Sequence, residues 1–220
     1  MTERTIRRED ARLLTGTGRF TADWNLPGQL HAFFLRSDRA HAEIVSLDSS
    51  AAASRPGVRA VLTGADYAAA GWKSLPRGVS YEGVGGQKMK RPFWPALAQG
   101  KVLYVGQPVA LVVAETAALA QDASEEITVA YRDLPAVTGF EAATRAGAAL
   151  LHPGIPGNLA FEYESGERAA VEAAFAGAAL RTRYALRSQR LVGNPIEPRA
   201  FSRASMPQAA CSLCTRPARE

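Results

Sequence analysis

A run of six apolar residues, VALVVA at positions 109–114, constrains the fold more than any other segment of the chain. Such a run is typical of a strand that is covered on both faces. It is followed by TAALAQDASEE at 116–126, a strong helix-forming segment with Thr116 placed as the N-cap, and by the strand pattern ITVAY at 127–131. If the two strands are neighbours, which the pattern leaves open, we expect a right-handed unit with parallel strands.

Three more strands are predicted upstream, at residues 29–36, 42–48 and 58–63. Side chains alternate between two faces in the first two, and a turn closes the third. An alanine-rich stretch at 49–54 suits a short helix, which Pro56-Gly57 would stop, and Gly64-Ala65-Asp66 would close the last strand as a turn. Strands and helices in this succession predict an α+β fold.

Periodicity is lost between residues 70 and 99, where glycine, proline and aromatic residues gather. A loop of about thirty residues is unusual inside a compact domain and is more often functional than idle. Two alternatives stand equally: a functional or interface segment, or a loop that is packed by its own side chains.

The character of the chain changes after Pro135. We predict a short helix at 140–145 and a rigid loop at 151–159, which would mark a boundary between domains. A helix at 167–175 follows, with an apolar stripe that includes Val171 and Phe175, and then an alternating strand at 179–187.

The formal net charge of +5 suggests nucleic-acid binding, but the basic residues are scattered singly along the sequence and are not interleaved with aromatic residues on one face. We therefore expect a solvated surface and no nucleic-acid partner. No segment approaches the roughly 18 apolar residues of a membrane helix. Residues 1–12 are rich in charge, so no secretory signal is expected, and two cysteines give no disulfide framework. The expected compartment is the cytoplasm.

Catalytic motifs are few. The sequence has no GxSxG nucleophile elbow and no GxxxxGK[ST] phosphate loop. His31, His41 and His152 have no metal-ligand spacing. Cys211 and Cys214 form a CxxC, but without a second pair or a βαβ context, so we interpret it as structural or accidental.

Glu197 is the one carboxylate in an unusual setting, because Pro195 and Pro198 hold the backbone around it extended. A general base needs a partner or substrate, and nothing nearby in the sequence supplies one. We expect Glu197 to orient a turn or to pair with Arg199.

Seven segments, in this order, resemble the molybdopterin-binding large subunits of the xanthine dehydrogenase, aldehyde oxidase and aerobic carbon monoxide dehydrogenase family. They cover about nine-tenths of the chain. The segments are RREDARLLTGTGRFTAD (7–23), PGQLHAFFLRSDRAHAEIVSLDSSAA (27–52), PGVRAVLTGAD (56–66), VLYVGQPVALVVAE (102–115), ITVAYRDLPAV (127–137), LHPGIPGN (151–158) and NPIEPRA (194–200).

The resemblance implies four parts: an N-terminal arm (1–15), an a/b hammerhead domain (16–126), the start of an α+β molybdopterin-binding domain (127–200) and an atypical tail (201–220). Complete members are oxidoreductases that hydroxylate aldehydes or N-heterocycles, or oxidise carbon monoxide, at a molybdenum–pterin cofactor. By resemblance, their partners are FAD-binding and 2Fe-2S subunits, in a heterotrimer that can dimerise.

The departure from the family begins after Ala200, where alternating strands are expected and FSRASMPQAACSLCTRPARE stands instead. We interpret this tail as the product of a shifted reading frame. The family's pterin loops and its catalytic glutamate would lie further on, so we predict a truncated large subunit that is inactive alone. No catalytic, cofactor-binding or metal-binding residue is predicted in this chain. Gln189, Glu197 and Arg199 mark the family-like segment that comes just before the cofactor site begins. The alternative is a non-catalytic scaffold that docks a partner through the loop at 70–99.

Overall fold

The computed structural model describes residues 10–76, 78–188, 191–195, 197, 200–205 and 212–215. The chain divides into two compact units, Gly28–Ala179 and a second unit that combines Met1–Pro27 with Leu180–Glu220. The division into four parts that the sequence suggested stays a prediction.

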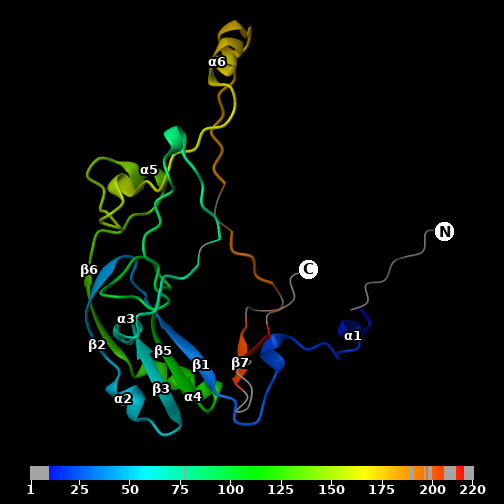
Figure 1. Ribbon diagram of the computed structural model, residues 1–220, viewed down its shortest axis with the longest axis vertical. Coiled ribbons are helices and arrows are strands. Elements are labelled where there is room, and N and C mark those ends of the chain that lie inside the picture. Colours follow the sequence, from blue (N-terminus) through cyan, green and yellow to red (C-terminus); the bar gives the residue numbers. More distant parts are fainter. Residues whose placement is uncertain are drawn as a thin grey trace, which may run out of the picture. The chain divides into compact units, whose positions relative to one another are not determined.

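The first sheet of the Gly28–Ala179 unit has three strands in the order β1–β5–β3, and both pairings are antiparallel (Figure 1). Its members are β1 (His31–Arg36), β5 (Pro108–Ala114) and β3 (Val58–Thr63). The apolar run at 109–114 is therefore the central strand. Ala110, Val112 and Ala114 are buried in one core and Val109 in another, whereas Leu111 and Val113 are half-buried, so the predicted cover is complete on one face and partial on the other.

Two helices, α2 (Ser50–Ser54) and α4 (Ala117–Glu125), pack on one face of this sheet. The predicted N-cap is confirmed, since the Thr116 hydroxyl accepts a hydrogen bond from the Leu119 amide at 3.1 Å. Small residues let the helices approach the sheet closely, and the buried core consists of Ala52, Ala110, Val112, Ala114, Ala120, Ala123 and Ile127.

The second sheet has the order β4–β2–β6, again antiparallel, from β4 (Lys101–Val102), β2 (Ala42–Asp48) and β6 (Thr128–Asp133). The expected parallel pair is wrong, because β5 and β6 lie in different sheets. The physical reason is burial: Val129 and Tyr131 of β6 pack on a second core that is made of Ala42, Ala98, Val102 and Val109.

The predicted turn at 64–66 is in fact the first turn of a helix, α3 (Gly64–Ala69). Thr63 and Asp66 form a reciprocal capping box: the Asp66 carboxylate accepts from the Thr63 amide and hydroxyl, both at 2.7 Å, and the Thr63 hydroxyl accepts from the Asp66 amide at 3.4 Å. This cap satisfies amides at the helix start, which is why the chain does not simply turn there.

The segment that lacked periodicity forms a long irregular hairpin. The Leu75 amide donates to the Trp94 carbonyl at 2.8 Å, Met89 to Tyr81 at 3.1 Å and Gly83 to Gln87 at 2.7 Å. The 3-10 turn η2 (Val84–Gly86) lies at the tip. The loop is therefore at least in part ordered by its own contacts.

The tip of this hairpin contacts residues 159–162. The Val84 amide donates to the Glu162 carbonyl at 2.9 Å, and the rings of Tyr81 and Phe161 stack with centroids 5.6 Å apart. The preceding loop contains α5 (Phe140–Thr144) and η3 (Pro156–Asn158). These contacts join the hairpin to the C-terminal part of the unit.

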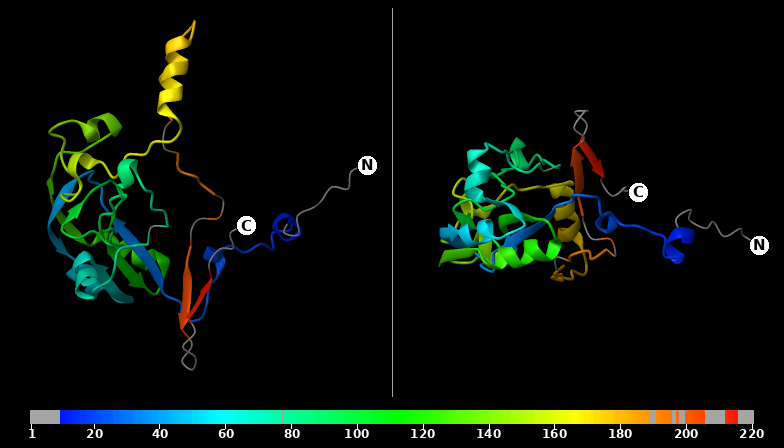
Figure 2. Two further views of the ribbon diagram at one scale, coloured as in Figure 1. Left: turned by 45° about the horizontal axis from the view of Figure 1, so that its top comes forward. Right: turned by 90° about the horizontal axis from the view of Figure 1, so that it is seen from below.

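The predicted helix near 167–175 is confirmed as α6 (Arg168–Gly177), which lies away from the two sheets of its unit (Figure 2). Its apolar stripe is exposed, including Val171 and Phe175. In the described part of the chain, no helix combines the length and the apolar character that crossing a membrane requires.

The second unit holds α1 (Asp10–Leu14), η1 (Thr21–Asp23) and a hairpin of β7 (Ser202–Ser205) with β8 (Ser212–Thr215). The strand predicted at 179–187 is wrong: the structure gives these residues no strand, and they are exposed. A strand needs a neighbour for its backbone groups, and among the described residues none pairs with this segment. Conversely, strands form in the tail, where no period predicted them.

Candidate functional site

A cleft of about 560 Å³ lies beside β2 and the start of α3 in the Gly28–Ala179 unit. It is lined by parts of three segments, residues 44–49, 63–68 and 98–100. Its size lies within the range of small-molecule sites. Ile44, Leu47 and Ala98 give its lining an apolar part, and Ser49 and Gln99 add polar groups.

Asp66 is the charged residue of the cleft among the described lining residues. Hydrogen bonds from the Thr63 hydroxyl and then the Thr63 amide hold the pKa of its carboxyl below the usual 3.8. The carboxylate is therefore ionised at neutral pH. The sequence analysis missed this cleft; the T-x-x-D spacing of Thr63 and Asp66 was the available signal of the helix start beside it.

The lowered pKa of Asp66 predicts a pH dependence of stability. A carboxyl whose folded pKa is depressed adds stability above its unfolded pKa, here about 3.8, and loses it as the pH falls through the folded pKa. We expect Asp66→Ala to be less stable than the wild type at pH 7, and the difference to shrink below pH 3.8. Urea unfolding across this range measures it. Asn at position 66 cannot titrate, so the difference in unfolding free energy between Asp66→Asn and Asp66→Ala should be the same at every pH. If that difference disappeared in acid, titration of Asp66 would not be the cause of the pH dependence.

Glu197, the carboxylate singled out in the sequence, contacts Thr21. Its Oε1 accepts hydrogen bonds from the Thr21 amide at 3.2 Å and the Thr21 hydroxyl at 3.3 Å. Both residues belong to the Met1–Pro27, Leu180–Glu220 unit. The first and last family-like segments therefore meet, and Glu197 orients the turn η1. Gln189 and Arg199 lie outside the described residues, as does Cys211; Cys214 belongs to β8.

We expect Glu197→Ala to speed hydrogen exchange of the Thr21 amide about tenfold, because removing one hydrogen bond to a charged acceptor is worth about 1.4 kcal/mol of local opening. Glu197→Gln keeps an acceptor oxygen and should have a smaller effect. Hydrogen exchange followed by NMR or mass spectrometry checks this. An unchanged exchange rate of the Thr21 amide in Glu197→Ala would show that the contact between Glu197 and Thr21 does not stabilise η1.

His41 is 5% exposed and is the buried histidine of the unit. Its Nδ1 lies 2.8 Å from the Pro135 carbonyl oxygen. A carbonyl can only accept, so Nδ1 carries the proton. Among the described atoms, Nε2 has no hydrogen-bond partner. This geometry ties the start of β2 to the segment that leaves β6.

The cleft does not fit the anionic phosphate of a molybdenum–pterin cofactor. Within the described ranges, no three His, Cys, Asp or Glu side chains gather where they could hold a metal. The cleft offers Asp66 as its charge, and a carboxylate repels the anionic phosphate of a pterin cofactor. No chemical step through that cofactor can be assigned to these residues.

Comparison with known proteins identifies the fold. The profile of the a/b hammerhead domain of aldehyde oxidase and xanthine dehydrogenase matches residues 15–135. The gamma subunit of the 6-hydroxypseudooxynicotine dehydrogenase complex of Paenarthrobacter nicotinovorans is 40% identical over 195 residues, which are 89% of this chain and 24% of that subunit. The nicotinate dehydrogenase large molybdopterin subunit of Eubacterium barkeri is 35% identical over 137 residues, 62% of this chain and 29% of that one.

Comparison with a solved structure supports the same family. Reconstituted CO dehydrogenase from Oligotropha carboxidovorans superposes with a TM-score of 0.65 and 33% identity, over 82% of this chain and 22% of that chain. The chain thus spans about a quarter of the length of these relatives. With a profile match over more than half of its residues, this chain belongs to the aldehyde oxidase and xanthine dehydrogenase family, whose a/b hammerhead domain it carries.

Proposed function

We propose that this chain supplies the hammerhead part of a molybdenum hydroxylase large subunit, and that alone it is inactive and holds no cofactor. The observation that carries the proposal is the hammerhead match over residues 15–135, in a chain that covers about a quarter of relatives named as molybdopterin or dehydrogenase subunits. The poor fit of the cleft to a pterin cofactor supports the statement that the chain alone holds no cofactor.

Among the reactions of the family, we favour oxidative hydroxylation of an N-heterocycle. The 40%-identical relative is named for 6-hydroxypseudooxynicotine and another for nicotinate, both pyridine compounds, whereas identity to the CO dehydrogenase chain is 33%. The proposed partners are an FAD-binding and a 2Fe-2S subunit, because electrons must leave the molybdenum centre. Two cysteines in 220 residues suit a reducing compartment, which we take to be the cytoplasm.

A segment exchange tests this function. The 195-residue matching segment of the Paenarthrobacter gamma subunit is replaced by its counterpart from this chain. We expect the hybrid to bind molybdenum and to oxidise 6-hydroxypseudooxynicotine, with the same subunit lacking the segment as the inactive control. A scaffold of unrelated function would leave the hybrid inactive.

Elemental analysis of the 220-residue chain, purified from molybdate-supplemented cells, tests separately whether the chain alone holds a molybdenum cofactor. We expect no molybdenum above the background of a non-metalloprotein. Stoichiometric molybdenum would contradict the proposal.

A further inference from the structure

The positive charge of this chain is concentrated in one segment. Residues 70–107 contain six basic residues and one acidic residue, Glu82, a balance of five charges that equals the whole net charge of +5. The other 20 basic and 20 acidic residues cancel. Basic residues occur singly along the whole chain, but the excess of basic over acidic residues lies in this one segment. The six are Lys73, Arg77, Lys88, Lys90, Arg91 and Lys101.

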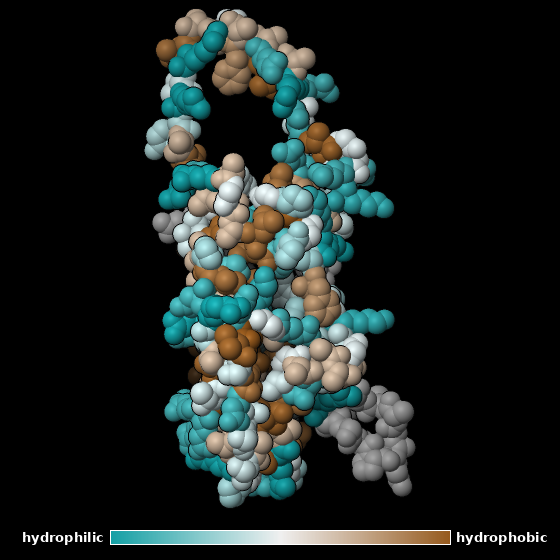
Figure 3. Space-filling view, turned by 90° about the vertical axis from the view of Figure 1, so that its left-hand side faces the viewer, coloured by the Kyte–Doolittle hydropathy of each residue, from teal (hydrophilic) through white to brown (hydrophobic). Residues whose placement is uncertain are grey.

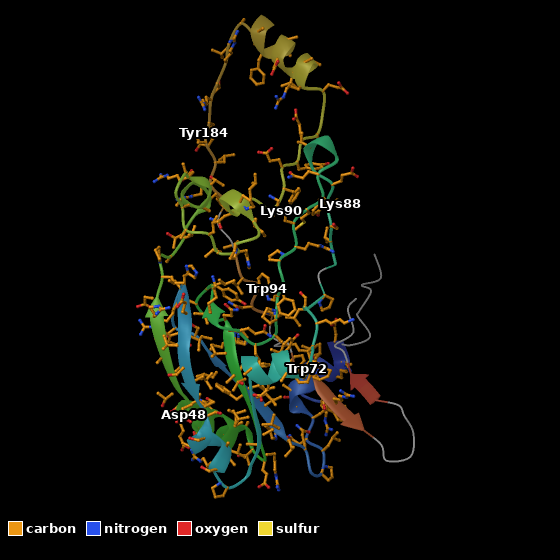
Figure 4. All side chains as sticks on the ribbon, turned by 60° about the vertical axis from the view of Figure 1, so that its left-hand side comes forward. Asp48, Trp72, Lys88, Lys90, Trp94 and Tyr184 are labelled. Carbon is orange, nitrogen blue, oxygen red and sulfur yellow. The ribbon has the colours of Figure 1, made fainter. Side chains whose placement is uncertain are left out.

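The same segment exposes large aromatic side chains. Five rings are between 39% and 51% exposed, those of Trp72, Tyr81, Phe93, Trp94 and Tyr104. Apolar groups gathered in this way mark interaction sites more often than chance exposure, and aromatic residues with arginine are enriched at protein interfaces. In Figure 4, the labelled Lys88 and Lys90 lie nearer the tip of the hairpin, and Trp94 and Trp72 lie nearer its base. Hydrophobic residues also reach the surface among hydrophilic ones on the face shown in Figure 3.

Four of these residues, Trp72, Arg91, Trp94 and Tyr104, are held in place by contacts within or beside the hairpin. Two hydrogen bonds fix the Trp94 backbone: its carbonyl accepts from the Leu75 amide, and its amide donates to the Ser74 hydroxyl at 3.0 Å. Its ring lies 6.0 Å from that of Tyr104, and Trp72 meets the buried Tyr67 edge to face at 5.2 Å. The Arg91 guanidinium donates to the Val79 carbonyl. Such preorganisation lowers the entropy that binding must overcome.

We propose that this basic-aromatic surface, formed by residues 70–76 and 78–107, docks a companion subunit whose own face has an apolar centre and an acidic rim. The inference rests on the proposed function, since it takes the chain to belong to a multisubunit hydroxylase. Charge selects the partner: acidic groups opposite Lys73, Lys88 and Lys90 would be attracted and would speed association. The aromatic rings would supply the buried centre, where most binding energy resides.

Two other occupants fit less well. A second copy docked through the same surface would bring like charges together, which is unfavourable. Single-stranded nucleic acid needs free ring faces for base stacking. Here the Tyr81 ring is stacked on Phe161, and the rings of Trp94 and Tyr104 lie tilted against each other at 34°.

Binding of the full chain to the co-expressed companion subunits of the Paenarthrobacter 6-hydroxypseudooxynicotine dehydrogenase complex tests the surface. Two variants are measured by biolayer interferometry at low and high salt: Lys73→Glu with Lys88→Glu, and Phe93→Ser. These three side chains are exposed, so folding should be retained. The matched control is Arg183→Glu with Arg187→Glu, which changes the charge equally outside the surface.

We expect the Lys73/Lys88 reversal to weaken binding at least tenfold at low salt, and less at high salt, where screening is stronger. Phe93→Ser should weaken it at both, and the control should not. Equal binding by all variants, or no binding by the wild type, would overturn the docking surface. The segment exchange described above would still report on the proposed function, because its readout is activity in the hybrid subunit. Tighter, reversal-sensitive binding to a mixed-sequence single-stranded RNA, or a wild-type dimer lost in the variants, would also overturn it.

Discussion

Gly64→Ala is expected to destabilise the Gly28–Ala179 unit by about 3 kcal/mol, the upper part of the usual range for an over-packed interior. A Cβ at Gly64 would lie 1.9 Å from the Ala98 carbonyl oxygen and 2.8 Å from its carbon. Both are backbone atoms, and the Ala98 amide is itself bonded to Pro108 at 2.8 Å. Neither side can yield easily, so the substitution must push α3 and residues 98–99 apart. Urea unfolding measures the loss.

Gly154→Ala is the matched control. A Cβ there meets no atom within 4 Å. We expect its stability to change by no more than about 0.5 kcal/mol, as for most surface substitutions. If Gly64→Ala unfolded at the same urea concentration as the wild type, the close approach of α3 to residues 98–99 would be incorrect.

Asn158→Ala is expected to lower stability by a similar amount, about 3 kcal/mol for three hydrogen bonds at roughly 1 kcal/mol each. The Asn158 Oδ1 accepts from the Leu151 amide at 3.1 Å. Its Nδ2 donates to the Ala143 and Ala149 carbonyls, both at 2.9 Å. One side chain thus holds together the loop between α5 and η3. Thermal unfolding with local hydrogen exchange of the Leu151 amide gives the readout.

Two further substitutions separate the causes. Asn158 has φ of +54°, a left-handed conformation that asparagine tolerates and alanine resists. Asn158→Gly relieves that strain but loses all three bonds, so it should remain clearly destabilised. Asn158→Asp keeps the acceptor and turns the donor into an oxygen that faces two carbonyls. A fully stable Asn158→Asp would show that the donated bonds contribute little.

Local structure followed closely from the sequence. The sequence pattern predicted β2 and β3 with their observed bounds, and the Thr116 hydroxyl caps α4 as expected. These features depend on residues that are near each other in the chain. Periodicity and capping report such short-range causes directly.

Which strands pair with each other was harder to predict from the sequence. The alternation in β6 shows that one face is buried, but not against which sheet, and it is the contact of Val129 and Tyr131 with the second core that places it beside β2. The same limit explains residues 179–187, where a strand pattern has no neighbouring strand in the described structure. The right period is necessary for a strand, and a partner is needed as well.

The site was the hardest part to predict. The cleft exists because residues 44–49, 63–68 and 98–100 meet, and no motif spans them. Glu197 drew attention through its flanking prolines, but its partner Thr21 is 176 positions away. The family resemblance located both segments without indicating that they touch.

The antiparallel pairing of β3 with β5 has a consequence for variation in this family. The two strands close the intervening segment at its base, so the sheet does not depend on what lies between them. Doubling the length of a closed flexible loop costs only about 0.6 kcal/mol in closure entropy. The hairpin between α3 and the buried Leu97 can therefore be lengthened or exchanged while both cores, with Ala98 and Val102 in the second, stay folded. This gives a lineage a way to change what its large subunit binds without rebuilding its core.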